Sequence, residues 1–327
     1  MLRPYPRAAA YLFALLCACS APAGTKIDSQ KMLELHSEMA LRYFDQGDLV
    51  RAEDQVSKGL NIDPKNEQLQ LMLGWIRQRR GERDDIQIAE KIFRKLLKTK
   101  DYRAELGLAE ALERKGLLYT QSAAAIASGA RESIAADPEA QVAKMRTDAA
   151  QFWRESIRWY MQVLERRPED PQAMNGLMRV TALQGENEKS WQWSQTLADQ
   201  TQRELDFWRE RIERPDIGAD EESRFREIVR KTTDLLAETH MHASTLAWRM
   251  GRPEEALAQL DRVLVLHPEQ ADAYSRRAVI LKELGRYDEA IPSIDEFLRL
   301  STLEFEHPDI QRAFQVKEAC IAALAAK

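Results

Sequence analysis

The chain has 327 residues, of which 31% are charged and 44% hydrophobic, and its formal net charge is −5. It has only 13 glycines and 12 prolines. This scarcity argues against β-sandwiches and phosphate-loop enzymes, because both need glycine in their turns. Three cysteines are too few for a disulfide scaffold, and the negative charge argues against a nucleic-acid binder. The composition therefore favours a helical, strongly charged protein.

The first eighteen residues have the pattern of a secretory leader. Two arginines precede an apolar stretch, residues 8–18, which is too short to span a bilayer. The stretch ends in Leu16-Cys17-Ala18-Cys19, which resembles a bacterial lipobox. The resemblance implies that the leader is removed and that Cys19 becomes the lipidated N-terminus. An ordinary secretory signal cleaved near Ala23 is the alternative.

The residues after Cys19 indicate where in the cell the protein is located. Ser20 follows the cysteine, and in lipoproteins of this kind a serine there implies the outer membrane, facing the periplasm. Residues 19–30 are small and polar, so we expect a flexible tether. Removal of residues 1–18 takes away two arginines and no acid, which changes the net charge from −5 to −7.

Three segments, residues 36–64, 240–268 and 271–300, share one pattern of small and turn-forming residues. In each, a small residue on a first helix is followed by a turn glycine and by an alanine on a second helix. Proline ends the first two segments. The positions are Ala40, Gly47, Ala52 and Pro64; Ser244, Gly251, Ala256 and Pro268; and Ala278, Gly285 and Ala290. The pattern resembles the tetratricopeptide repeat (TPR), a helix–turn–helix unit of 34 residues.

The turn glycines give the length of the array. They occur at Gly47, Gly81, Gly116, Gly185, Gly251 and Gly285, with gaps of 34, 35, 69, 66 and 34 residues. Gly218 divides the second large gap in half. The spacing indicates about eight repeat lengths, two of them degenerate. We predict an all-α fold, which the resemblance makes a right-handed superhelical solenoid of about six to eight TPR repeats.

Some repeat boundaries lack turn residues between 138 and 250. Apolar residues recur every three or four positions through 138–166, 187–213 and 220–250 without an internal breaker. We therefore predict fused helices of about 27–31 residues there. The last two should form a long hairpin around residues 215–218, whereas a plain linker at 205–236 is the alternative.

The array as a whole, residues 31–327, divides into three parts. They are N-terminal repeats at 31–116, degenerate repeats with long helices at 117–250, and a C-terminal repeat with a capping helix at 251–327. Residues 117–136, rich in alanine and serine, are expected to be helical or to form a partly ordered insertion.

No residue pattern indicates catalysis, a cofactor or a metal site. The five histidines are scattered, and His240 and His242 point to different sides of one helix. No Gly-rich phosphate loop or Ser/His/Asp pattern occurs. Cys320 is expected in the core. We therefore predict a non-enzyme that uses no cofactor, binds no metal and binds no nucleic acid.

Several large apolar residues fall at positions that face the concave groove in TPR proteins. Counted from the turn glycines, these partner-binding candidates are Leu41, Phe44, Leu71, Trp75, Met241 and Trp248. Exposed apolar side chains there would bind a peptide or helix of a protein partner. Packing between helices is the alternative role.

The sequence thus predicts a lipid-anchored scaffold for protein–protein interaction in the cell envelope. Residues 31–100, with the lipobox, are similar to the pilotin lipoproteins of type IV pili. That similarity implies assembly of a pilus or secretion complex. One alternative is an adaptor that recruits peptidoglycan hydrolases or proteases. Another is a non-catalytic subunit of a glycan-handling enzyme.

Overall fold

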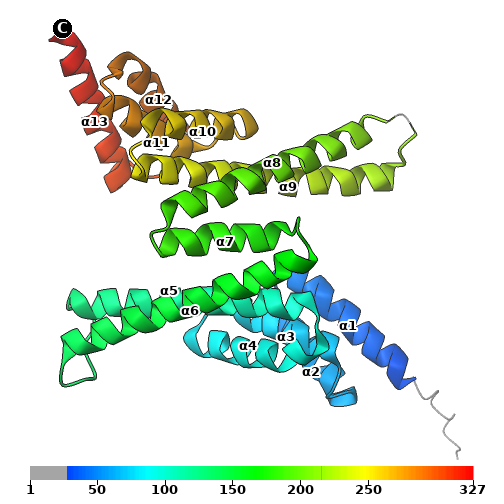
Figure 1. Cartoon of the computed structure of the whole chain (residues 1–327). Helices are drawn as coiled ribbons and strands as arrows, with labels where there is room; N and C mark the ends of the chain where they lie inside the picture. Colours follow the sequence, from blue (N-terminus) through cyan, green and yellow to red (C-terminus); the bar gives the residue numbers. More distant parts are fainter. Residues whose placement is uncertain (1–27, 215, 327) are drawn as a thin grey trace, which may run out of the picture. The chain divides into compact units, whose positions relative to one another are not determined.

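The computed structural model describes residues 28–214 and 216–326. Within these ranges the chain forms thirteen α-helices and one short 3-10 helix, and contains no strand (Figure 1). The helices divide into two compact units, whose boundary in the sequence lies between Leu69 and Gln70. The all-α prediction is confirmed.

The first unit is a helix hairpin followed by the start of a third helix. Helix α1 (Ser29–Asp45) begins after Asp28, whose side chain accepts a hydrogen bond from the Gln30 N–H. Helix α2 (Leu49–Ile62) is capped in the same way by Asp48. Ala40 and Ala52 are fully buried between the two helices. Small side chains at these positions allow the two backbones to approach closely.

The second unit holds the remaining helices. Helix α3 (Glu67–Arg80) crosses the boundary in the sequence. The helices that follow are α4 (Arg83–Leu96), α5 (Tyr102–Ala127), α6 (Pro138–Arg166), α7 (Pro171–Leu183), α8 (Asn187–Ile212), α9 (Ala219–Arg249), α10 (Pro253–Leu266), α11 (Ala271–Glu283), α12 (Tyr287–Leu300) and α13 (Pro308–Ala325). The 3-10 helix η1 (Leu97–Thr99) lies between α4 and α5.

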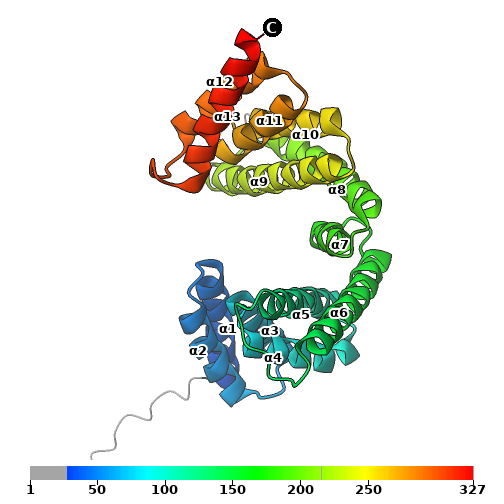
Figure 2. The same ribbon diagram turned by 90° about the vertical axis from the view of Figure 1, so that its left-hand side faces the viewer.

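From α4 to α13, each helix packs against the next one in the sequence (Figures 1 and 2). Contacts between helices two apart occur as well, between α5 and α7 and between α11 and α13. This chain-order packing is the arrangement of a helical solenoid, in which every unit buries its apolar face against its neighbours. The core is accordingly divided into several clusters along the array.

The prediction of fused helices is confirmed. Helix α6 has 29 residues, α8 has 26 and α9 has 31. Helices α8 and α9 pack along each other as a long hairpin (Figure 1). Buried residues recur along α9 from Thr232 to Ala247 at spacings of three and four, which explains why a continuous helix is stable there.

The prediction that Gly116 is a turn glycine is wrong. Gly116 is buried inside α5, and a Cβ atom added to it would lie 2.3 Å from Nε1 of Trp153. It lacks a side chain because α6 approaches α5 closely at this point. The turn of this hairpin is at Gly129, whose φ of +75° places it in the left-handed region that glycine tolerates.

The described residues therefore hold six hairpins that have a turn glycine, rather than eight repeat lengths. Their turn glycines all have positive φ: Gly47, Gly81, Gly129, Gly185, Gly251 and Gly285. Gly218 is not one of them, because it has a φ of −74° and is the N-cap of α9. The junction between α8 and α9 connects two hairpins, so Gly218 divides the gap without marking a repeat.

The alanine-rich segment 117–136 is helical in its first half. Residues 117–127 continue α5, and the helix ends at Ser128, directly before Gly129. At the other end of the chain, α13 covers α11 and α12 and buries Ile310 and Cys320.

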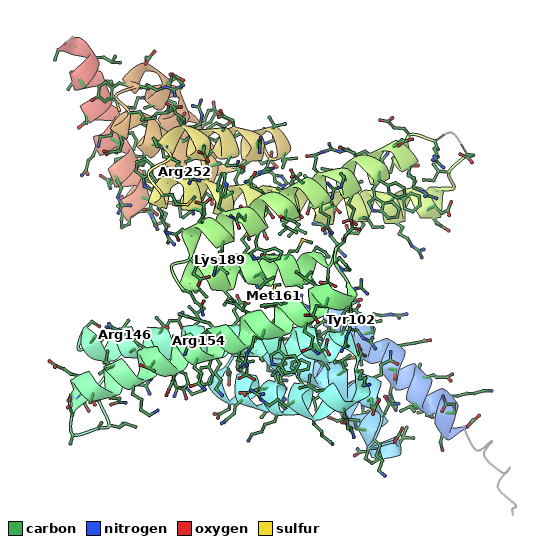
Figure 3. All side chains as sticks on the ribbon, in the orientation of Figure 1. Tyr102, Arg146, Arg154, Met161, Lys189 and Arg252 are labelled. Atoms are coloured by element: carbon green, nitrogen blue, oxygen red, sulfur yellow. The ribbon has the colours of Figure 1, made fainter. Side chains whose placement is uncertain are left out.

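Charged side chains cover the outer surface of the helices (Figure 3). Many pair within one helix, but some connect neighbouring hairpins. Arg252, at the start of α10, bonds Glu188 of α8 at 3.0 Å. Exposed pairs of this kind contribute less than about 1 kcal/mol each, so the apolar clusters dominate the stability of the array.

Candidate peptide-binding groove

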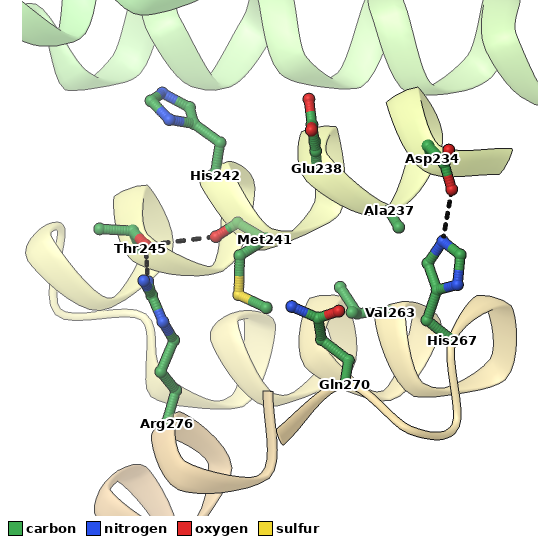
Figure 4. Close-up of a pocket in the computed structure, with 10 residues that line it drawn as sticks. All are labelled: Asp234, Ala237, Glu238, Met241, His242, Thr245, Val263, His267, Gln270 and Arg276. Carbon is green, nitrogen blue, oxygen red and sulfur yellow. Dashed lines mark hydrogen bonds and ion pairs between the residues drawn. The ribbon is translucent and has the colours of Figure 1, made fainter. Parts of the chain in front are cut away.

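A groove of about 520 Å³ lies between α9, α10 and α11 (Figure 4). Its size falls in the range of pockets that bind small ligands or short peptide segments. Helix α9 contributes one face of its central part, and α10 and α11 contribute residues around the turn that connects them. The lining residues are Asp234, Ala237, Glu238, Met241, His242, Thr245, Val263, His267, Gln270 and Arg276.

The α9 side of the groove follows from helical periodicity. Asp234, Glu238, Met241 and Thr245 are separated by four, three and four residues, so that they lie on one face of the helix. Met241 places an apolar side chain in the middle of this face, between two carboxylates and a hydroxyl group. The groove therefore combines apolar and polar contacts, as pockets that bind peptides do.

Hydrogen bonds fix both ends of the groove (Figure 4). At one end, Nη1 of Arg276 donates to Oγ1 of Thr245 at 2.7 Å, and this hydroxyl donates to the carbonyl of Met241 at 3.2 Å. At the other end, Nε2 of His267 lies 3.2 Å from Oδ1 of Asp234. Because these bonds connect α9 to α11 and to the end of α10, the side chains are positioned before any partner binds.

His242 is neutral at physiological pH. Burial, together with the positive charges of Arg179 and Arg249, lowers its pKa to about 4. Its Nε2 lies 3.4 Å from Oγ of Ser190. The ring can therefore donate or accept a hydrogen bond in the groove but adds no charge there.

His240 does not take part in the groove. Its Nδ1 hydrogen-bonds Oε1 of Gln259 at 2.7 Å, in the core between α9 and α10. The two histidines thus have separate partners, as their spacing predicts. Among the described residues, no group of three or more His, Cys, Asp and Glu side chains is arranged to hold a metal ion.

The structure separates the predicted groove residues into two groups. Met241 lines the groove, and Trp248 lies seven residues further along α9 with 40% of its surface exposed. In the first unit, Leu41 is 50% exposed and Phe44 is half-buried on α1. These four side chains are at least partly exposed.

For Leu71 the prediction of an exposed groove position is wrong. Leu71 is 5% exposed and belongs to the core cluster formed by α3, α4 and α5. Trp75 is half-buried and packs edge-on against Phe93, with ring centroids 5.3 Å apart. Both side chains point to α4 and α5, because this face of α3 is covered by the next hairpin.

The residues predicted to define the repeat lie where close packing or a turn requires them. Ala40, Ala52, Ala256 and Ala290 are fully buried. Pro64 and Pro268 lie in the turns after α2 and α10.

The polar groove residues were not identified from the sequence. Asp234, Glu238 and Thr245 share a helix face with Met241, so helical spacing alone could have identified them. No such signal exists for His267 and Arg276. They enter the groove because of the packing of α10 and α11 against α9.

A second polar cluster lies partly buried between α3, α5, α6 and α7. Glu113 accepts two hydrogen bonds from Arg179, at 2.7 and 2.9 Å, and one from the Tyr160 hydroxyl at 2.7 Å. Glu110 accepts a bond from Nε2 of Gln78 at 2.7 Å, and burial raises its pKa to about 7. These bonds connect α5 to α3, α6 and α7.

The predicted lipidation site, Cys19, lies outside the described residues. None of the described helices is both long enough and apolar enough to cross a membrane. Cys320, on α13, is a free thiol and is fully buried in the core, as predicted.

Comparison with known families supports the repeat assignment. Residues 243–303 match the family model described as tetratricopeptide repeat. The matched segment runs from the last two turns of α9 through α12 and contains the α10 and α11 side of the groove. The fold thus defines a helical repeat scaffold, a class that uses its surface to bind other proteins. The repeats at 243–303 are tetratricopeptide repeats, as the sequence pattern predicts.

Several solved structures match the chain at low sequence identity. TTC0263 from Thermus thermophilus is 17% identical, with a TM-score of 0.48, over 78% of this chain and 99% of that one. Pseudomonas aeruginosa PilF is 11% identical over 90% of both chains, with a TM-score of 0.37. YrrB, a TPR protein with an unusual peptide-binding site, is 14% identical over 61% of this chain and 84% of that one, with a TM-score of 0.37. No curated protein sequence matches the chain significantly.

Proposed function

We propose that this chain is a lipid-anchored scaffold of the cell envelope that holds a segment of a protein partner in the α9–α11 groove. The proposal rests on the groove between α9, α10 and α11. The groove lies partly on the segment that matches the tetratricopeptide repeat model, has an apolar centre at Met241, and is bordered by positioned polar groups. Peptide recognition in grooves relies on this combination of apolar anchoring and directed polar contacts.

The proposed anchor rests on the sequence. The lipobox-like motif before Cys19 and the short apolar leader support lipidation, and Ser20 supports the outer membrane, facing the periplasm. Several acyl chains on one residue anchor a protein stably, because each buried CH₂ contributes about 0.8 kcal/mol. In this setting the scaffold would serve the assembly of a pilus or secretion complex.

Site-specific photocrosslinking in the native host tests the groove. Met241 and Val265 are each replaced by the photoreactive amino acid p-benzoylphenylalanine. Val265 is a matched control because it is an apolar residue of α10, 81% exposed and outside the groove. We expect a discrete crosslinked protein from position 241 and none from 265. Equal crosslinking from both positions, or none from 241, would contradict the groove proposal.

The identity of the crosslinked protein decides the biological setting. A secretin or pilus subunit supports the assembly role. A peptidoglycan hydrolase or protease instead supports the adaptor that recruits such enzymes, and removes the assembly role.

The variant Cys19→Ala tests the anchor. We expect it to lose both acyl labelling and membrane association, since no described helix could replace the lipid as a membrane span. A variant that remains acylated and membrane-bound would refute the lipoprotein assignment.

A further inference from the structure

The α9–α11 groove has opposite charges at two points along α9. Glu238 is exposed on the groove face and, among the described residues, forms no hydrogen bond or ion pair. Seven residues further along α9, the guanidinium of Arg276 is bonded to Thr245 and pairs with no carboxylate of the described chain. Both charges are therefore available to a partner.

The distance between the two charges follows from helix geometry. Seven residues of α-helix rise about 10.5 Å, which separates the Glu238 position from the Thr245 hydroxyl that holds Arg276. Met241 lies between them, three residues after Glu238. The face thus presents an acidic group, an apolar group and a basic group in order.

Neighbouring charged residues add to the negative charge at the acidic end of the groove and to the positive charge at its basic end. Asp234, one turn before Glu238, adds a second carboxylate at the acidic end, although its charge is shared with Arg230 and His267. At the basic end, Arg249 follows Thr245 by one turn and likewise has no carboxylate partner among the described residues.

We propose that the groove binds an extended segment of a protein partner in which a basic and an acidic side chain lie four residues apart, with an apolar side chain midway between them. This inference rests on the proposed function of the groove. Residues separated by two or four positions in an extended chain share one face, and four residues span about 13 Å. Long charged side chains bridge the small difference from the rise of about 10.5 Å between Glu238 and Thr245. The basic side chain pairs with Glu238, the acidic one pairs with Arg276, and an apolar side chain between them packs on Met241.

The dimensions of the groove favour an extended segment over a helix. One turn of α-helix rises only about 5.4 Å. A single turn cannot present two charges about 10 Å apart, whereas an extended chain can.

A random dodecapeptide library displayed on phage, selected against the full chain in detergent, tests the inference. We expect the selected peptides to share a basic and an acidic residue at a spacing of four. Against the double variant Glu238→Lys/Arg276→Glu, these peptides should bind roughly tenfold more weakly, because like charges then face each other. Peptides with the two charges exchanged should regain affinity for the double variant.

The control double variant is Arg203→Glu/Glu210→Lys. These residues are exposed on α8, seven positions apart, and form no ion pair among the described residues. We expect peptide binding to be unchanged in this variant. An equal loss in both double variants, a shared spacing of seven, or selected peptides without the charge pair would overturn the inference. Selection of no peptide at all would instead contradict the proposed function of the groove.

Discussion

At the residue scale, Gly116 shows how one missing side chain determines the packing of two helices. Its backbone lies against the Trp153 indole, whose Nε1 donates to the carbonyl of Glu113 at 3.2 Å. Alanine in a helix interior is normally about 1 kcal/mol more favourable than glycine. Here the added methyl group would overlap the indole, so steric cost outweighs propensity.

We therefore expect Gly116→Ala to lower the free energy of unfolding by about 1–3 kcal/mol, measured by urea denaturation. Gly218→Ala is the control, because Gly218 has a negative φ and open space around it. The control should change stability by less than about 1 kcal/mol. A Gly116→Ala variant as stable as the wild type would show that α5 and α6 can separate at no cost.

Glu110 is a second residue whose surroundings determine its chemistry. Burial raises its pKa to about 7, against a value near 4.3 for glutamate in an unfolded chain. The folded state thus binds the proton more tightly. The protonated Glu110 therefore favours the folded state. This stabilisation is complete below about pH 4.3 and is lost as the pH rises through 7.

We expect Glu110→Gln to be more stable than the wild type at pH 8, by roughly 2–3 kcal/mol. The difference should vanish near pH 4, because glutamine resembles the protonated carboxyl and can still accept the bond from Gln78. Chemical denaturation from pH 4 to 8 measures the difference, with the exposed Glu210→Gln as control. A difference independent of pH would contradict the assigned pKa.

At the element scale, the α8–α9 hairpin is held at its far end by an aromatic cluster. Trp208 of α8 contacts Phe225 of α9, with ring centroids 4.9 Å apart. Phe207 packs against Trp208, and the guanidinium of Arg211 lies 5.3 Å from the Phe207 ring. Because few other apolar residues are buried near this end, the cluster determines local stability.

We expect Phe225→Ala to increase amide hydrogen exchange in residues 205–212 and 219–230, with no change in residues 253–300. Hydrogen-exchange mass spectrometry measures this, and Ser223→Ala, an exposed neighbour on α9, is the control. Faster exchange throughout α10–α12 would mean that the hairpin end and the C-terminal repeats unfold together.

At the scale of the whole molecule, stability depends on the contacts between successive helices. Helix α13 packs on α11 and α12 and borders a small cavity of about 70 Å³ together with Ile294 and Phe297. In a solenoid the terminal element shields the apolar face of the hairpin beneath it. Removal of α13 would expose that face to water.

We expect truncation after Ser301 to lower the melting temperature and to promote self-association, measured by calorimetry and light scattering. Truncation after Ile321 is the control, because it removes only the last turn of α13 and keeps the buried Ile310 and Cys320. A Ser301 truncation that remains monomeric and equally stable would show that α13 does not shield the array.

The amino-acid sequence by itself determined the class of the fold and much of its detail. The helices at 138–166, 187–212 and 219–249 follow from apolar residues at helical spacing, which is a local property. Five of the six predicted turn glycines adopt positive φ, because the left-handed conformation is a property of the single residue. The buried alanines of the repeat follow from the same spacing.

Only the tertiary structure decided which faces are covered and which are open. Gly116 lies inside a helix and Leu71 in the core, since both depend on how closely a neighbouring helix approaches. The charged groove depends on Arg276 bonding Thr245 across two helices, 31 residues apart in sequence. Spacing along one helix shows which residues share a face, whereas packing between helices decides what that face contacts.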